Sequence, residues 1–253
     1  MTKIVVDHGT YYIKYGYSGY NKPLGSVKVN NDKIIKNSVI VDYNKMIDIW
    51  DDIFYNKLDI NIITTDILLT DTVYGGDVNR EKIINIMLNH YNFKRVTIQN
   101  QQILALYSTC RDKGLVIDIG YSTTRIVPIY ESYILVKGIV MSSFGYHCVD
   151  KLGKQLYREK LVNNISKLVI KSIKSTPIDY RRIMLENILL VGGGSKFTGL
   201  TQDIVKTIRS IYKTKSKIKI YAPKDRYYIS WIGGSVLCSL PDDIWTHNKK
   251  LIK

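Results

Sequence analysis

The sequence predicts an α/β protein that contains two copies of one strand–turn–strand unit. An apolar run ending in an aspartate, a turn with glycine and a second β-like run occur at residues 3–19 and again at 114–127. Elsewhere, β-branched runs alternate with segments of helical periodicity, which is typical of α/β proteins. The duplication predicts two similar lobes. No linker-like composition divides the chain, so we expect the lobes to be packed together.

The first half begins with the hairpin at residues 3–19, which carries Asp7 at its tip. Residues 21–45 are polar and hold two short β-like runs around Asn30-Asn31-Asp32, a turn signal. Beyond them, apolar residues three and four positions apart predict helices, and β-branched runs predict buried strands. These patterns predict helices at 46–54, 77–91 and 101–108, and strands at 61–69 and 96–98.

The second half begins with the hairpin at residues 114–127, in which Asp118-x-Gly120 repeats Asp7-x-Gly9. A buried strand at 188–191 leads into a turn of three glycines. Around this strand, the apolar spacing predicts helices at 145–157, 161–175, 200–212 and 228–240, and an alternating strand at 217–221.

The composition excludes several classes of protein. The chain has 253 residues, 45% of them hydrophobic, which suits one large domain or two small ones. Its 3 cysteines exclude a disulfide framework and have no metal-ligand spacing. No stretch approaches the roughly 20 apolar residues of a membrane span, and the first residues lack the apolar region of a signal peptide. We therefore expect a reducing compartment, the cytoplasm, with the nucleus as the alternative.

The formal net charge of +15 lies almost entirely in the last two-fifths of the chain. Residues 1–150 have 16 Lys+Arg and 15 Asp+Glu, whereas residues 151–253 have 21 and 7. A basic block of this kind can hold phosphate or an acidic partner. Composition alone is the alternative explanation, because richness in Ile, Lys, Asn and Tyr is typical of an AT-rich genome, such as that of a large DNA virus or a protist.

Two aspartate-ended hairpins and a glycine turn are parts from which phosphate sites are built. Backbone amides in a turn of small residues point at phosphate oxygens. A carboxylate at the root of each hairpin can hold a hydrated divalent cation. Each part alone is more often a simple turn, because an aspartate after a strand commonly bonds to backbone amides. Their order along one chain favours a nucleotide site.

Longer motifs accompany these parts. They are Asn79-Arg-Glu-Lys-Ile-Ile-Asn-Ile-Met87, Ile126-Val-Pro-Ile-Tyr-Glu-Ser-Tyr133, Gly192-Gly-Gly with Gly199, and Lys217-Ile-Lys-Ile-Tyr-Ala-Pro223 with Ser230-Trp-Ile-Gly-Gly-Ser235. With them the chain resembles actin and the actin-related proteins over nearly its whole length. The resemblance implies the actin-like ATPase fold, a ribonuclease H-like duplicated α/β fold with two packed lobes.

The resemblance also implies domain boundaries. Residues 1–112 plus 222–253 correspond to the first base subdomain of an actin, and residues 113–221 to the second. A stub near residues 20–45 stands where actins have subdomain 2, and subdomain 4 is nearly absent. We therefore expect the base of an actin without its upper extensions.

Several residues match the nucleotide site of actins. Asp7 and Asp118 stand where actins keep the aspartates associated with the metal, and Gln101 where they keep the glutamine that positions the attacking water. These three residues are the catalytic candidates, and the two aspartates are the metal candidates. The candidates for nucleotide binding are Gly9, Thr10, Lys14, Gly120, Gly192, Gly193 and Gly194.

Four substitutions predict that this site is degenerate. Tyr11 and Ser122 replace loop glycines, Tyr121 replaces an acidic residue, and Tyr227 replaces a lysine near the adenine. A side chain in place of glycine adds bulk where backbone approaches phosphate, and it disfavours a turn with positive φ. Because phosphoryl transfer depends on positioning, we expect no hydrolysis and no cofactor, with bound ATP and Mg²⁺ as the alternative.

In actins, a hydrophobic cleft between the base subdomains takes helices of partner proteins, as helix-in-groove sites do. The matching residues are Tyr107, Cys110, Tyr133, Val236, Leu237 and Leu240. The alternative is that the tail at residues 241–253 folds back and fills this cleft.

Three functions remain open. The one we favour is a non-hydrolysing protein that contacts actin, an actin-binding protein or a larger complex, and that caps a filament rather than polymerising. The second is a nucleic-acid or chromatin-associated scaffold. Its basic face would consist of Lys167, Lys171, Lys174, Arg181, Arg182, Lys206, Arg209 and Lys213. The third is a residual ATP-binding protein that uses Asp7, Gln101 and Asp118.

Overall fold

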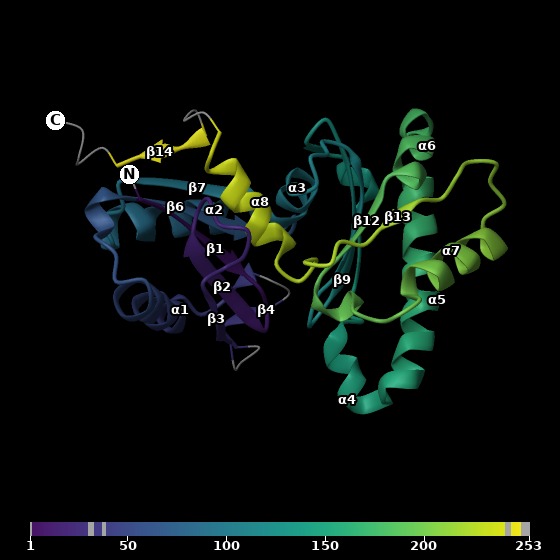
Figure 1. Ribbon diagram of the computed structural model, residues 1–253, viewed down its shortest axis with the longest axis horizontal. Coiled ribbons are helices and arrows are strands. Elements are labelled where there is room, and N and C mark those ends of the chain that lie inside the picture. The colour runs from purple at the N-terminus through teal and green to yellow at the C-terminus, as the bar shows by residue number, and fades with distance from the viewer. Residues whose placement is uncertain (1, 30–32, 37–38, 241–243, 249–253) are drawn as a thin grey trace. The chain divides into compact units, whose positions relative to one another are not determined.

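A computed structural model of the protein describes residues 2–29, 33–36, 39–240 and 244–248. The chain divides into two compact units, each described here by itself. Unit 1 consists of Met1–Ser108 and Ser230–Lys253, and unit 2 of Thr109–Ile229. Each unit is a mixed sheet packed by helices (Figure 1), so the predicted α/β class is confirmed. None of the described helices is long and apolar enough to cross a membrane.

The sheet of unit 1 has a parallel centre and antiparallel edges. In spatial order its strands are β14 (Thr246–His247), β7 (Arg95–Asn100), β6 (Thr65–Asp71), β1 (Thr2–His8), β2 (Tyr12–Tyr17) and β3 (Gly25–Lys28). β1 is parallel to β6 and β6 to β7, and every residue of β6 is buried, as expected of a central strand. The carboxyl ends of these three strands therefore meet at one edge of the sheet.

The remaining elements of unit 1 are helices and one small two-stranded sheet. They are β4 (Ile35–Lys36), β5 (Val39–Ile40), α1 (Tyr43–Asp51), the π-helix η1 (Asp52–Lys57), the 3-10 helix η2 (Ile62–Thr64), α2 (Gly76–Asn85), the π-helix η3 (Ile86–His90), α3 (Gln101–Tyr107) and α8 (Ile229–Leu237).

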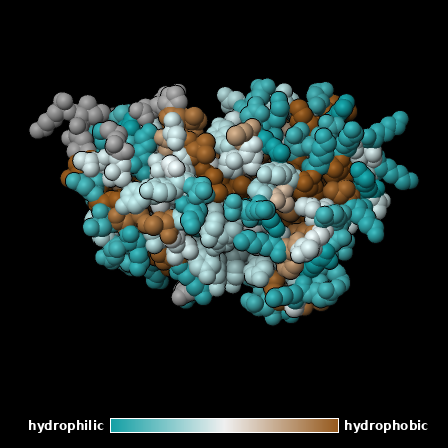
Figure 2. Space-filling view, viewed as in Figure 1, coloured by the Kyte–Doolittle hydropathy of each residue, from teal (hydrophilic) through white to brown (hydrophobic). Residues whose placement is uncertain are grey.

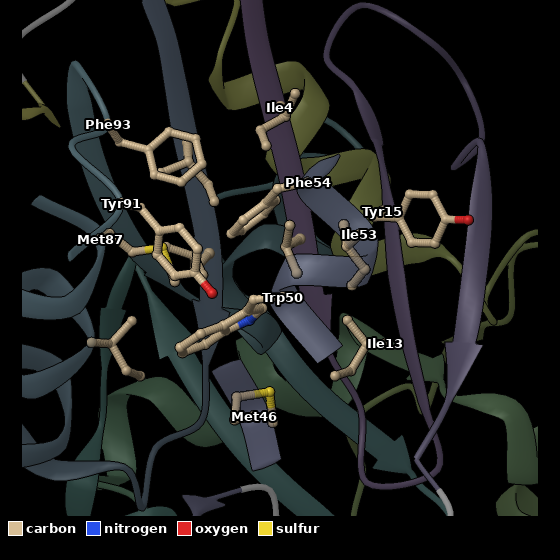
Figure 3. Close-up of a cluster of buried hydrophobic side chains, with 14 of the residues drawn as sticks. Ile4, Ile13, Tyr15, Met46, Trp50, Ile53, Phe54, Met87, Tyr91 and Phe93 are labelled. Atoms are coloured by element: carbon tan, nitrogen blue, oxygen red, sulfur yellow. The ribbon is translucent and has the colours of Figure 1, made fainter. Parts of the chain in front are cut away.

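Aromatic side chains fill the core of unit 1 beside α1 (Figure 3). Phe54 lies edge-on to both Tyr91 and Phe93, with ring centroids 5.1 Å apart in each pair. Trp50 is fully buried, and its ring centroid lies 6.5 Å from that of Tyr91. Edge-to-face pairs add about 0.5–1.5 kcal/mol each beyond the burial of their area. This cluster fixes the position of α1 against the sheet.

Two glycines allow α8 to pack closely within unit 1. A Cβ on Gly233 would lie 1.8 Å from the carbonyl oxygen of Leu104 on α3, and a Cβ on Gly234 would lie 2.8 Å from the side chain of Val5. On the same helix, Trp231 is fully buried and donates from Nε1 to the carbonyl of Val5 at 3.0 Å. The Trp-Ile-Gly-Gly-Ser motif thus attaches the last helix to the first strand.

The sheet of unit 2 contains the second hairpin. In spatial order its strands are β10 (Tyr133–Ile134), β9 (Thr124–Tyr130), β8 (Gly114–Ile119), β12 (Ile188–Val191) and β13 (Ile220–Tyr221), and β11 (Val140–Ser142) also pairs with β9. β8 is antiparallel to β9 and parallel to β12. The helices are η4 (Val136–Gly138), η5 (Tyr146–Cys148), α4 (Val149–Leu152), α5 (Lys154–Ser175), α6 (Ile178–Glu186), η6 (Gly193–Ser195) and α7 (Leu200–Ile211), of which η4, η5 and η6 are 3-10 helices.

The structure departs from the predicted elements in three places. The first part of the strand predicted at 61–69 is the 3-10 helix η2, and β6 begins only at Thr65. The helix predicted at 145–157 is broken at Gly153, whose φ of 73° and ψ of 158° cannot continue a helix. The strand predicted at 217–221 is reduced to β13, although the backbone of Lys219 also bonds to Leu185 and Ile188 at the start of β12. The turn predicted at Asn30-Asn31-Asp32 lies outside the described residues.

Candidate functional site

The first hairpin holds Asp7 opposite Lys14. β1 and β2 pair with these residues in register, and the amide of Gly9 donates to the carbonyl of Tyr12 at 3.1 Å to close the turn around the buried Thr10. Lys14 Nζ lies 2.8 Å from Asp7 Oδ2, and both side chains are almost fully buried. Because a buried charge is costly without a partner, each of these two groups requires the other.

The second oxygen of Asp7 accepts hydrogen bonds from the neighbouring strands. Thr70 Oγ1 at the end of β6 and Gln101 Nε2 just after β7 each donate to Oδ1 at 2.9 Å. Burial by itself would raise the pKa of Asp7. The charge of Lys14 and the hydrogen bonds from Lys14, Thr70 and Gln101 outweigh burial and hold this pKa below its ordinary value. Asp7 is therefore an ionised carboxylate at neutral pH.

Gln101 is engaged by acceptors of its own unit. Its Nε2 lies 2.9 Å from Asp7 Oδ1, 2.8 Å from the carbonyl of His8 and 3.2 Å from Thr70 Oγ1. A side-chain amide nitrogen has two hydrogens, so these acceptors take both. The side chain of Asn100 caps α3 and so fixes the backbone at Gln101. The amide thus braces the first hairpin against β6.

His8 belongs to the same cluster, although no pattern in the sequence singled it out. Its Nδ1 lies 3.1 Å from the carbonyl of Thr70, and its Nε2 lies 3.0 Å from Trp50 Nε1. Burial lowers the pKa of His8 and outweighs the opposing effects of Thr70 and Asp7. His8 is therefore a neutral link between the hairpin and α1.

The second hairpin repeats the first in detail. Asp118 lies across from Arg125 in the register of β8 and β9, and the amide of Gly120 donates to the carbonyl of Thr123 at 2.9 Å. Arg125 Nη1 lies 3.7 Å from Asp118 Oδ2, and the two side chains are 3% and 16% exposed. In both hairpins the basic residue stands seven positions after the aspartate, a signal that was present in the sequence.

The glycine turn touches the second hairpin and is held by its own chain. Gly192 has a φ of 89°, and a Cβ there would lie 2.3 Å from the carbonyl oxygen of Ile119 and 2.9 Å from Asp118 Oδ1. The amide of Gly192 donates to the carbonyl of Arg226 at 3.0 Å, and Arg226 Nε donates to Ser195 Oγ at 2.8 Å. Gly194 is buried. Glycine is therefore required at position 192 by both backbone conformation and space.

The match to a known family decides what these units are. A model of the actin family, described simply as Actin, matches residues 25–165 and 147–245. The chain belongs to the actin family. Its two units of mixed sheet and packed helices agree with the actin-like ATPase fold that the motifs predicted. Gln101, Asp118 and the glycine turn lie within the matched residues, and the hairpin of Asp7 precedes them.

The actin fold implies Mg²⁺ and ATP, but the residues of the second hairpin do not fit a hydrated cation. Asp118 faces the buried Arg125, a pairing for which the resemblance to actins gives no role. In the part of the chain that the structure describes, no three His, Cys, Asp or Glu side chains converge in a way that could hold a metal ion. A Cβ on Gly193 would lie 3.0 Å from the ring of Tyr227, so this tyrosine covers one face of the glycine turn.

The residues that replace loop glycines do not strain the backbone. This corrects the expectation that they would disfavour a turn with positive φ. Among the described residues, positive φ outside glycine occurs at Asp59, Asn92, Cys110, Glu131 and Ser132. Tyr11, Tyr121 and Ser122 are therefore in ordinary conformations, and both turns close without the positive φ that would require glycine. Tyr11 instead packs beneath Lys28, whose Nζ lies 5.0 Å from the ring centroid.

The residues predicted to line a partner cleft differ in exposure. In unit 1, Val236 and Leu240 are 44% and 51% exposed, but Leu237 is buried with Trp231 and Cys238. Leu237 faces the core of unit 1 rather than solvent, because successive helical residues point about 100° apart. Tyr107 packs against the same core. In unit 2, Cys110 and Tyr133 are exposed.

The described part of the tail, residues 244–248, packs on the sheet of unit 1. β14 pairs with β7, and Trp245 is buried. Lys3 Nζ and the guanidinium carbon of Arg95 lie 5.6 and 5.3 Å from the centroid of its ring. The rest of the tail that was considered as a cover for the cleft, residues 241–243 and 249–253, lies outside the described residues.

Most of the predicted basic residues of unit 2 are exposed. Lys167, Lys171 and Lys174 follow one side of α5, and Lys206 and Arg209 follow one side of α7, with Lys213 and Arg182 also exposed. Hydrophilic side chains cover much of the face of α7 in Figure 2. Arg181 is the exception, because it donates to the carbonyls of Thr176 and Lys174 at the end of α5 and is half-buried.

Proposed function

We propose that this actin-family chain acts by binding a protein partner and does not turn over ATP. The observation that supports the proposal is the hydrogen bonding of Gln101. Its side-chain amide donates to Asp7, to the carbonyl of His8 and to Thr70. A glutamine held in this way cannot donate to an attacking water without releasing the hairpin. The position of Tyr227 beside the glycine turn supports the same conclusion.

The partner surface that we propose lies at the end of α8. Val236 lies in the last turn of α8 and Leu240 lies three residues beyond its end at Leu237, and both side chains are exposed. Such a surface suits the apolar face of a partner helix or a neighbouring subunit at the end of an actin filament. The segments that match actin subdomains 2 and 4 are short, so a bound chain would offer little surface to the next subunit. We place this activity in the cytoplasm.

Elongation of actin filaments in the presence of the chain tests the partner proposal. We expect the wild-type chain to slow growth at one end, and the double variant Val236→Asp, Leu240→Asp to lose this effect while keeping the wild-type melting temperature. The matched control is Lys167→Asp, which adds a carboxylate to an exposed helix elsewhere. Unchanged elongation with the wild-type chain, together with no binding to monomeric actin, would reject an actin partner.

Thermal unfolding with Mg²⁺ and ATP tests the other half of the proposal. We expect no rise in the melting temperature at millimolar nucleotide and no release of phosphate. Ligand that binds only the folded state stabilises it by RT ln(1 + [L]/Kd), about 2.7 kcal/mol at a hundredfold excess over Kd. A rise of several degrees would instead favour a residual ATP-binding protein.

A second candidate function is nucleic-acid binding by unit 2. The observation that favours it is the exposed row of Lys167, Lys171 and Lys174 on α5. Binding through phosphates weakens steeply with salt, by about 10³–10⁵ between 50 and 200 mM for six to ten contacts. Affinity for a random duplex should therefore fall with salt and fall further in Lys167→Glu, Lys171→Glu. Affinity that is absent at low salt, or that does not change with salt, would eliminate this candidate.

A further inference from the structure

The two hairpins carry the same pairing of an aspartate with a basic residue. Lys14 lies across from Asp7, and Arg125 lies across from Asp118, each seven positions after its aspartate. The resemblance to actins assigns a role to Lys14 but none to Arg125. The Arg125 side chain is 3% exposed and has its ion pair with Asp118. A buried guanidinium at this place is therefore a feature of this chain that needs a reason.

We infer that Arg125 replaces a divalent cation at Asp118, so that the second hairpin is charge-neutral without metal. This inference rests on the proposed function, because it states how a hairpin of the nucleotide-binding type is kept folded without Mg²⁺. It also goes beyond that function, because it applies whether or not a nucleotide binds.

The chemistry of the two cations makes them alternatives. Mg²⁺ or Ca²⁺ binds a carboxylate oxygen directly at about 2.0–2.6 Å or through one of its waters. Either position at Asp118 would bring the ion close to the guanidinium, which lies 3.7 Å from Oδ2. Arginine does not lose its proton in proteins, so the repulsion cannot be relieved by titration. The Arg125 side chain is also only 3% exposed, so it is not a solvated surface group that water could screen.

The surroundings of Asp118 agree with this assignment. Beside its other oxygen, Oδ1, lies Gly192, where an added Cβ would be only 2.9 Å from that oxygen. Among the described residues, no second and third acidic, His or Cys side chain joins Asp118 in a group that could hold a metal. A cation at Asp118 would therefore have to displace Arg125 and would not find three protein ligands there.

Thermal unfolding of the full chain tests the inference, with EDTA compared against about 10 mM MgCl₂ or CaCl₂. We expect the wild-type chain and Arg125→Lys, which keeps the charge, to melt within about 1 °C in all three conditions. Arg125→Gln leaves the Asp118 carboxylate without its counter-charge. We expect this variant to gain a cation-dependent rise of about 2–4 °C, which the double variant Asp118→Asn, Arg125→Gln loses.

Two results would overturn the inference. One is a cation-dependent rise in the wild-type chain that Asp118→Asn abolishes, and the other is a folded Arg125→Gln that does not respond to cations. If Arg125→Gln does not fold, titration calorimetry of the wild-type chain with MgCl₂ decides: absence of binding heat supports the inference, and heat that Asp118→Asn removes rejects it. ATP added in EDTA separates the two proposals, because stabilisation without metal contradicts the proposed function alone.

Discussion

Trp50 donates a hydrogen bond from Nε1 to Nε2 of His8 at 3.0 Å, and this contact fixes the protonation of the imidazole. An indole N–H can only donate, so Nε2 carries no proton, and the proton is on Nδ1, which faces the carbonyl of Thr70 at 3.1 Å. The neutral ring satisfies both neighbours. A second proton on Nε2 would break the bond to Trp50 and place a charge in the core of unit 1.

We therefore expect stability to fall in acid from about pH 6.5 downwards. The pKa of His8 is lowered in the folded state, so between its folded and unfolded values the unfolded chain binds more protons. Stability then falls with pH by at most about 1.4 kcal/mol per unit. Denaturant unfolding between pH 4.5 and 7.5 measures this slope. The pKa of Asp7 is also lowered, so its contribution is lost only below about pH 4.

His8→Gln should flatten the slope between pH 4.5 and 6.5, because an amide does not titrate there. The matched control is His90→Gln, which replaces an exposed histidine outside this cluster. A slope that survives in His8→Gln would assign the acid sensitivity to other groups.

Lys14→Met should destabilise unit 1 by about 3–5 kcal/mol, the cost of leaving one member of a buried ion pair without its partner. Asp7 would keep the hydrogen bonds from Thr70 and Gln101 but would lose the positive charge of Lys14, which lies 2.8 Å away. Lys45→Met is the control, because its pair with Asp42 is exposed and should contribute less than about 1 kcal/mol. Equal losses in the two variants would contradict the assigned role of Lys14.

Gly192→Ala should destabilise unit 2 more than Gly153→Ala. Both glycines have positive φ and extended ψ, a region that only glycine occupies readily, so each substitution costs about 1–3 kcal/mol in backbone strain. At Gly192 the new Cβ also meets the carbonyl oxygen of Ile119 at 2.3 Å, whereas nothing lies within 4 Å at Gly153. Unfolding free energies of the two variants measure this difference, and similar values would show that the turn can move.

Leu237→Ala should cost about 2–5 kcal/mol, as for other buried leucines. Val236→Ala should lie within about 0.5 kcal/mol of the wild-type chain, because Val236 is 44% exposed. Thermal or denaturant unfolding distinguishes them. The contrast between Leu237 and Val236 also matters for experiments on partner binding. A substitution of Leu237 would test folding, whereas a substitution of Val236 would test contact with a partner. A large loss in Val236→Ala would mean that this residue is part of the core.

The sequence by itself determined the hairpins, the order of strands and helices, and membership of the actin family. These features depend on local periodicity and short motifs, such as Asp7-x-Gly9 and Asp118-x-Gly120, which are read along the chain. Even the pairing of Asp118 with Arg125 has a local cause, because a tight hairpin places residues seven positions apart across from each other. The helix break at Gly153 was harder to predict from the sequence, because glycine also occurs within helices.

Only the tertiary structure decided which side chains meet across the fold. Trp50 reaches His8 from 42 positions further along the chain, and Gln101 reaches Asp7 from 94 positions further along. Such contacts depend on how whole elements pack, which periodicity does not specify. The same is true of Leu237 and Val236, neighbours of similar hydrophobicity on one apolar helix, because the core of unit 1 receives only one side of α8.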